Sequence, residues 1–124
     1  MGYVQQIMKF SESLKKNQQF RTVYENGKST ANRYIVLYKL ENGLDRNRLG
    51  ISVSKKVGNS VVRHRLTRLV RESYRLHEKM FNSGLDIVVV ARSGAKDCSY
   101  HEIESAFLHL SKLHGILKNE MIMR

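Results

Sequence analysis

The stretch from Ile51 to His77 limits what this chain can fold into more than any other, because it joins a strand-like segment, a basic loop and a two-faced helix. Residues 48–54 predict a strand, and residues 55–59 predict a loop after it. Over residues 60–77, stepping about 100° per residue gathers the apolar side chains into one arc, which predicts a helix packed on a core. The arc holds Val62, Leu66, Leu69, Val70, Ser73 and His77, flanked by Tyr74 and Leu76.

The opposite side of this predicted helix carries basic side chains. They are His64, Arg68, Arg71 and Arg75 at positions i, i+4, i+7 and i+11. Arg65 lies to one side of this stripe, Arg63 projects from the first turn beside the apolar arc, and Lys55 and Lys56 precede the helix. Glu72 is the only acid between Lys55 and Arg75. A solvated helix face usually mixes signs, because like charges one turn apart repel by about a few tenths of a kcal/mol. A stripe of one sign therefore favours a polyanionic partner, RNA or DNA.

The length, net charge and cysteine count of the chain agree with this interpretation. A chain of 124 residues predicts one domain, residues 1–124, and its formal charge of +11 attracts polyanions. The single cysteine, Cys98, cannot form an internal disulfide and fits a reducing compartment, so we expect a cytoplasmic protein. No apolar run approaches the roughly 18 residues of a membrane span, and we expect no membrane partner.

The first half of the chain predicts a helix and strands. Residues 1–10 are expected to form an arm that frays or packs, and Ser11 or Ser13 to cap a short helix ending near Phe20. Residues 21–29 are expected to extend and to turn at Asn26-Gly27, a dipeptide suited to positive φ. Residues 33–40 predict a strand, and the polar residues 41–47 predict a hairpin loop to the next strand.

The last third predicts one more strand and one more helix. Residues 85–91 are almost continuously apolar, which is typical of a strand buried on both faces. Ser99 and Glu102 form a capping box at the start of a helix. Its core-facing side chains are expected to be Ile103, Ala106, Phe107, Leu110, Leu113 and Leu117. The order α-β-β-β-α-β-α predicts an α+β fold, an α/β sandwich.

The sequence offers little for catalysis or metal binding. The five histidines form no pair at i, i+4, and no cysteine pair accompanies them. Gly50 and Gly58 stand alone, so no glycine-rich phosphate loop is predicted, and Asp86 and Asp97 are isolated carboxylates. We expect no catalytic residue and no metal site in this chain.

Aromatic side chains supply a second possible contact with nucleic acid. Phe20 and Tyr24 lie one helical turn apart, and Tyr34 and Tyr38 share one face of a predicted strand. Rings beside a basic surface are suited to stacking on unpaired bases. For any single ring, an ordinary place in the core is an equally good interpretation.

Several motifs together resemble the bacterial ribonuclease P protein subunit. They are Leu14-Lys15-Lys16-Asn17, Phe20, Ala31-Asn32-Arg33, Val36-Leu37-Tyr38, the run from Gly50 to Glu72, and Asp86 to Arg92. The most specific part, Ser52 to Arg71, reads SVSKKVGNSVVRHRLTRLVR. The resemblance implies three helices on a mixed sheet of about four strands, with an unusual left-handed βαβ crossover through the basic helix. It also implies that a large RNA carries the catalysis, using Mg²⁺ to release the 5′ leader of precursor tRNA, and that the chain is a subunit of this endoribonuclease.

The resemblance also assigns roles to residues. The family's Arg-Asn-Arg signature falls on Arg63, His64 and Arg65, with His64 in place of the usual Asn and Thr67 in place of a frequent Lys. The leader cleft falls on Phe20, Tyr24 and Tyr38, but not on Tyr34, which we expect in the flank or core. The predicted RNA-binding residues are Lys55, Lys56, Asn59, Ser60, Arg63, His64, Arg65, Arg68, Arg71 and Arg75.

Three other classes fit parts of the pattern. A structural RNA-binding protein of ribosomal type would use the same charge without preferring precursor over mature tRNA. A DNA-binding helix lacks a recognisable helix-turn-helix pair, so DNA is not expected as a partner. A stand-alone nuclease lacks catalytic residues.

Overall fold

The computed structural model describes residues 8–118, which form three α-helices and a five-stranded mixed sheet. The strands are β1 (Ser11–Ser13), β2 (Lys28–Ala31), β3 (Ile35–Glu41), β4 (Asn47–Ser52) and β5 (Leu85–Ala91). The helices are α1 (Asn17–Asn26), α2 (Ser60–Leu76) and α3 (Tyr100–Leu113), and the short 3-10 helices η2 (Glu78–Met80) and η3 (Ser93–Ala95) flank β5. The expected α+β class is confirmed.

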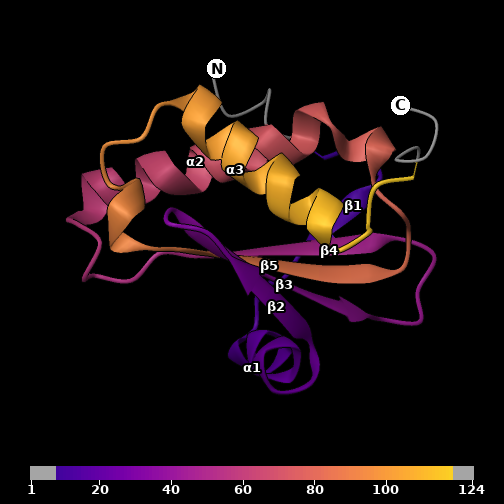
Figure 1. The fold of residues 1–124 in the computed structure, drawn as a ribbon. Coiled ribbons are helices and arrows are strands. Elements are labelled where there is room, and N and C mark those ends of the chain that lie inside the picture. Colours follow the sequence, from indigo (N-terminus) through magenta and orange to yellow (C-terminus); the bar gives the residue numbers. More distant parts are fainter. Residues whose placement is uncertain (1–7, 119–124) are drawn as a thin grey trace.

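The sheet is covered on both faces. Its strand order is β1-β4-β5-β3-β2, with β1, β4 and β5 parallel to one another and β3 antiparallel to both β5 and β2. Helices α2 and α3 lie on one face, and α1 lies on the other (Figure 1). The central strand β5 is therefore buried from both sides, as its apolar run predicts.

The connection from β4 through α2 to β5 joins neighbouring parallel strands, as a βαβ unit does. The left hand of this crossover stays a prediction from the resemblance. None of the described helices is long and apolar enough to cross a membrane.

Two expectations about strand pairing are wrong. The sheet has five strands rather than about four, because β1 adds a short parallel strand beside β4. The loop at residues 42–46 does not close a hairpin, because β5 lies between β3 and β4. The polar composition of this loop predicts a turn, but it carries no information on which strands pair.

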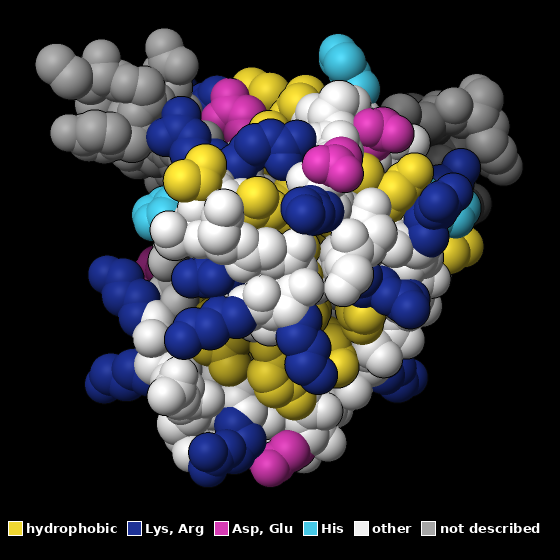
Figure 2. All heavy atoms as spheres, turned by 90° about the vertical axis from the view of Figure 1, so that its left-hand side faces the viewer, with side chains coloured by type: hydrophobic (Ala, Val, Ile, Leu, Met, Phe, Trp, Pro, Cys, Tyr) yellow, Lys and Arg dark blue, Asp and Glu magenta, His cyan; other side chains and the backbone are white. Residues whose placement is uncertain are grey.

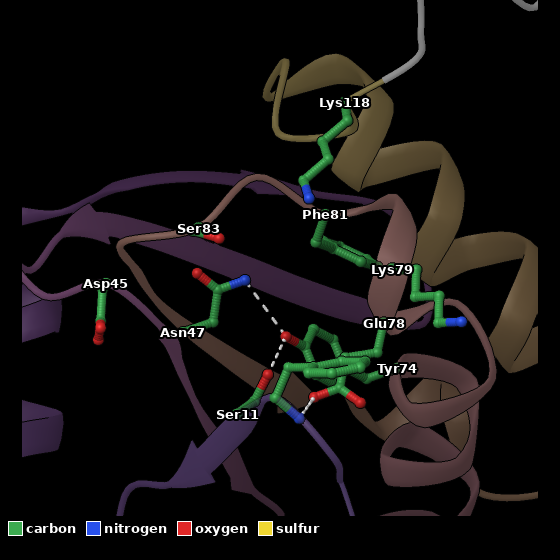
Figure 3. A pocket seen from close by; sticks show the side chains of 10 residues that line it. Ser11, Asp45, Asn47, Tyr74, Glu78, Lys79, Phe81, Ser83 and Lys118 are labelled. Atoms are coloured by element: carbon green, nitrogen blue, oxygen red, sulfur yellow. Dashed lines mark hydrogen bonds between the residues drawn. The ribbon is translucent and has the colours of Figure 1, made fainter.

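The start of the chain also differs from the expected helix. Ser11 and Ser13 belong to β1 instead of capping a helix, and α1 begins at Asn17. Long-range contacts hold β1 in place. The Tyr74 hydroxyl lies 2.6 Å from Oγ of Ser11 and accepts from the Asn47 amide at 3.2 Å (Figure 3). Just before the strand, the carboxylate of Glu78 accepts the backbone N–H groups of Lys9 and Phe10. Of the predicted arm, residues 1–7 lie outside the described part of the chain.

Helix α1 continues through residues that were expected to be extended. Asn26-Gly27 ends this helix instead of forming a turn, and Gly27 has a negative φ of -82°. Glycine fits here because of close packing, since a Cβ would lie 2.7 Å from the carbonyl oxygens of both Lys39 and Val23. The chain can therefore pass directly from α1 into the edge strand β2.

The main core lies between the sheet and the α2–α3 layer. Tyr74, Phe81 and Phe107 form an aromatic cluster, with ring centroids 4.9 to 6.4 Å apart. The expected capping box of α3 is confirmed, because the Ser99 hydroxyl accepts from the Glu102 N–H and the Glu102 carboxylate accepts from the Ser99 N–H.

The C-terminal half of α3 departs from the prediction. Leu113 is 61% exposed instead of facing the core. The helix ends at this residue, and Gly115 then adopts a φ of +70°, which turns the chain and breaks the helical period. Leu117 still packs against the core, from the segment that follows this turn.

A buried ion pair fixes the starts of β4 and β5. Asp86 is 3% exposed and receives two hydrogen bonds from the Arg48 guanidinium, at 2.8 and 2.7 Å. The Asn42 amide donates to the same carboxylate at 2.9 Å, which also ties down the loop between β3 and β4.

We predict that Asp86→Asn lowers the free energy of unfolding by about 3 kcal/mol, because it leaves a partly buried guanidinium without its counter-charge. Asp45→Asn is the matched control, since Asp45 also bonds an arginine but is exposed, and it should cost less than about 1 kcal/mol. Urea unfolding at pH 7 measures both. Equal midpoints for the two variants would contradict the structural role of the Asp86 pair.

Candidate nucleic-acid interface

A buried valine and a backbone hydrogen bond fix the basic loop between β4 and α2. Val57 is buried, and its N–H donates to the Ser54 carbonyl at 3.1 Å, which closes a turn and leaves Lys55 and Lys56 exposed. Gly58 lets the loop approach α2, because a Cβ there would lie 2.8 Å from the Cβ of Val62. The loop therefore presents its two lysines from a fixed base.

The start of α2 is tied to this loop. The Asn59 side chain caps the helix by accepting the Val62 N–H at 3.0 Å, and the Arg63 guanidinium donates to the Gly58 carbonyl at 2.9 Å. Two of the predicted RNA-binding residues, Asn59 and Arg63, thus also hold the loop on the helix. Ser60 begins the helix and is exposed.

Helix α2 divides into an inner and an outer face, as its period predicts. Leu66, Val70, Ser73 and Tyr74 are buried, and Val62 and Leu69 pack partly against the core. Leu76 is exposed. On the outer side His64 and Arg68 are exposed, whereas Arg71 is half-buried and this burial lowers the pKa of its guanidinium.

The arginines of α2 differ in what balances their charge. Arg75 forms two hydrogen bonds with the Glu72 carboxylate, at 3.0 and 2.7 Å, and this partner raises the pKa of Arg75. Arg63 and Arg65 instead donate to backbone carbonyls, which are neutral; those of Arg65 belong to Lys96 and Cys98. The structure therefore leaves positive charge at the start of α2 and compensates it near the end.

The three aromatic residues Phe20, Tyr24 and Tyr38 come together on the other face of the sheet. Tyr24 and Tyr38 meet edge to face with ring centroids 5.0 Å apart, and Phe20 and Tyr24 lie 6.4 Å apart. Val23, on the same helix as Phe20 and Tyr24, is fully buried against Val88 and anchors α1 on the sheet. We call these three rings the aromatic surface.

A glycine in β4 makes room for the aromatic surface. A Cβ on Gly50 would lie 2.7 Å from Cε2 of Phe20, so this ring packs directly on the backbone of the strand. Tyr34 does not join the three rings. It packs against the main core under the Arg33 guanidinium, 5.3 Å from its ring centroid, as expected for a flank or core residue.

Basic side chains surround apolar surface at one end of the molecule. Figure 2 views the left-hand side of Figure 1, where the loops after β4 and β5 lie, and shows dark blue Lys and Arg side chains around a yellow patch at the height of α1 and the sheet. Because β4 and β5 are parallel neighbours, Arg92, just after β5, lies at the same edge of the sheet as the basic loop. Arg92 and Lys96 were not among the residues predicted from the sequence, because their place beside the basic loop follows from the strand order, which the sequence does not show.

A contact between His77, at the end of α2, and Glu104 links α2 to α3. His77 Nε2 lies 2.8 Å from a carboxylate oxygen of Glu104, and the Tyr100 hydroxyl donates to the same oxygen at 3.1 Å. The hydrogen bond from His77 is the main reason that the pKa of Glu104 is lowered. Among residues 8–118, no three His, Cys, Asp or Glu side chains are grouped to hold a metal ion.

Comparisons with known proteins agree on one family. The family model described as Ribonuclease P matches residues 8–114. The "Ribonuclease P protein component" of Lachnoclostridium phytofermentans is 65% identical over 109 residues, which cover 88% of this chain and 94% of the relative. The relative from Alkaliphilus metalliredigens with the same name is 53% identical over 103 residues, which cover 83% of this chain and 93% of the relative.

Solved structures give the same result. The Staphylococcus aureus RNase P protein superposes with a TM-score of 0.79 at 40% identity, covering 84% of this chain and 95% of that one. The RNase P protein from Thermotoga maritima gives a TM-score of 0.75 at 32% identity, and the match covers 82% of this chain and 96% of that one. The similarity thus extends over most of the fold, and the family model spans α1 and α2.

We predict that Glu104→Gln lowers stability by about 1 kcal/mol at pH 7, because the carboxylate loses its charge-assisted hydrogen bonds. A lowered pKa in the folded state stabilises the protein above the ordinary pKa of 4.5, and this contribution is lost as the pH falls through the folded value. The difference between wild type and variant should therefore shrink below about pH 4.5 in urea unfolding curves. Glu25→Gln, at an exposed acid of α1, is the control, and a difference that did not depend on pH would contradict this role of Glu104.

Proposed function

Because this chain belongs to the ribonuclease P protein family and thereby to the machinery of tRNA 5′ processing, we propose that it binds the catalytic RNA through α2 and the 5′ leader of precursor tRNA through the aromatic surface. The observation that carries the proposal is the arrangement on the two faces of the sheet. Positive charge at the start of α2 follows the end of β4 on one face, and the aromatic surface covers the middle of the other face, where Tyr38 and Gly50 both pair with Val88.

The basic loop and α2 are suited to the phosphates of a folded RNA. Lys55, Lys56, His64 and Arg68 are exposed on elements fixed by buried contacts, so little backbone conformational entropy is lost when they bind. Phosphate contacts fix position and orientation but do not distinguish bases. This surface would therefore orient the protein on the RNA, and its affinity should fall steeply with salt.

The aromatic surface is suited to a single strand. Bases of any sequence can stack on rings, at about 1–3 kcal/mol per base. Tyr24 is 39% exposed and offers a ring edge and face to such a strand, while Phe20 and Tyr38 support it. A leader of variable sequence fits this chemistry, because stacking tolerates every base.

We assign no catalytic residue to this chain. The described residues bring together no carboxylate, histidine or cysteine set for metal-assisted hydrolysis, and we derive no step through a protein-bound metal. Mg²⁺ would be held by the RNA, and the protein would act by binding and orienting the leader. Such a complex would work in the cytoplasm, where precursor tRNA is made.

Cleavage of 5′-labelled precursor tRNA at low Mg²⁺ tests the proposal. The lanes contain the protein alone, a bacterial ribonuclease P RNA alone, and both together. We expect correct leader release to be far faster in the combined lane. No enhancement would leave a basic RNA binder of the ribosomal type, and cleavage by the protein alone would overturn the assignment of catalysis to the RNA.

We predict that Tyr24→Ala weakens binding of leader-bearing precursor tRNA to the reconstituted complex by about tenfold and leaves mature tRNA unaffected, because the variant removes one stacking partner. Phe10→Ala is the control, since Phe10 is an exposed ring that is 57% accessible and lies beside η2. Filter binding of both tRNAs measures the difference. Equal losses for precursor and mature tRNA would remove the aromatic surface from the leader path.

A further inference from the structure

We propose that a strip along the flank of α2, formed by Val61, the stem of Arg65 and the accessible edge of Leu69, binds the apolar face of an unpaired RNA nucleotide. The inference rests on the proposed function and adds a contact that does not depend on charge. It gives α2 a means to distinguish folded RNA with exposed bases from a regular duplex.

The strip is a shallow hollow along the flank of the helix, between its outer side and its buried arc. Its lining residues are Ser60, Val61, His64, Arg65, Arg68 and Leu69. Val61, Arg65 and Leu69 are spaced four residues apart and follow one another along one face. At about 1.5 Å per residue the strip is about 12 Å long, which is longer than one nucleotide.

Val61 has no role in the fold that would explain its side chain. It is 73% exposed, more than any other large apolar residue in the described part of the chain, and it lies outside the buried arc of α2. A β-branched residue is also a weak helix former. Neither core packing nor helix propensity therefore accounts for a valine in the first turn of α2.

Arg65 completes the strip through its stem. Its guanidinium donates to the backbone carbonyls of Lys96 and Cys98, so the head group is turned toward the loop before α3. The methylene groups are then left between Val61 and Leu69, where they extend the apolar surface. On this view Arg65 is a positioning residue, which holds the loop in place and fills the strip.

Charge identifies the occupant as nucleic acid. His64 and Arg68 line the same hollow, and Lys55 and Lys56 lie in the loop before it, so an apolar protein segment would meet a strongly basic rim. An unpaired nucleotide offers both partners that the surface requires, an apolar base or ribose face and a phosphate. Paired bases in an A-form duplex keep their faces stacked inside and cannot supply the first.

The test compares Val61→Ser with Leu113→Ser, at a leucine in the last turn of α3 that is 61% exposed, and with Lys56→Gln. Each full-length variant is titrated over a range of salt against a bacterial ribonuclease P RNA and against a fully paired RNA duplex of matched length. Circular dichroism and urea unfolding check that each variant folds.

We expect Val61→Ser to raise the Kd for the ribonuclease P RNA about fivefold at every salt concentration, without changing the slope of log K against log salt. The Kd for the duplex should not change. Lys56→Gln should flatten the slope by about one unit with both RNAs, and Leu113→Ser should leave binding unchanged.

An unchanged Kd for Val61→Ser would overturn the apolar contact, and the proposed function would stand if Lys56→Gln still flattened the slope. If neither variant had an effect, the proposed RNA surface of α2 would fail as well. An equal loss with duplex RNA, a changed salt slope for Val61→Ser, or an equal loss for Leu113→Ser would each overturn the specific contact with an unpaired nucleotide.

Discussion

The burial of β5 on both faces is the constraint on which the rest of the structure depends. Its apolar run is stable only in the middle of the sheet, so β3 and β4 lie on either side of it and do not pair with each other. Because β4 and β5 are parallel, the loops that follow them emerge at the same edge. This is why Lys55 and Lys56 reach the same end of the molecule as Arg92, although about 35 residues separate the two loops in sequence. A hydrophobic requirement in the core thus concentrates charge on the surface.

The distribution of ion pairs also affects where positive charge remains without a carboxylate partner. The acids pair with arginines near the starts of β4 and β5 and near the end of α2, in the pairs Glu12–Arg46, Asp45–Arg46, Asp86–Arg48 and Glu72–Arg75. Arg63 and Arg65, at the start of α2, bond to neutral carbonyls and keep their full charge. Carboxylates therefore neutralise arginines near the starts of β4 and β5 and near the end of α2, whereas the hydrogen bonds of Arg63 and Arg65 are with neutral groups. An uneven distribution of charge of this kind helps to orient a polyanion before any specific contact forms.

Sequence periodicity predicts the elements whose stability comes from one continuous face. The inner face of α2, the run of β5 and the capping box at Ser99 are all visible in the chain and are confirmed. The strand β1 is not visible, because three residues carry no period and distant partners hold them, namely β4 through the backbone and Tyr74 through Ser11. Strand order is hidden for the same reason, since the pairing of β5 with both neighbours is not encoded in any local segment. The predicted hairpin between β3 and β4 is wrong for this reason, because β5 lies between them.

The candidate site shows the same limit at the level of single side chains. Spacing alone treats the arginines of α2 as one stripe, and it cannot distinguish Arg75, which a carboxylate one turn away balances, from Arg65, which reaches across to the loop before α3. It also cannot show that the ring of Phe20 packs on the backbone of Gly50, because this contact joins α1 to β4, which are distant in sequence. Residues that bind and residues that position are therefore alike in the sequence and differ only in their partners. In the interface that we propose, both roles occur along α2, so the same contacts that fix the fold also decide which charges would remain available for RNA.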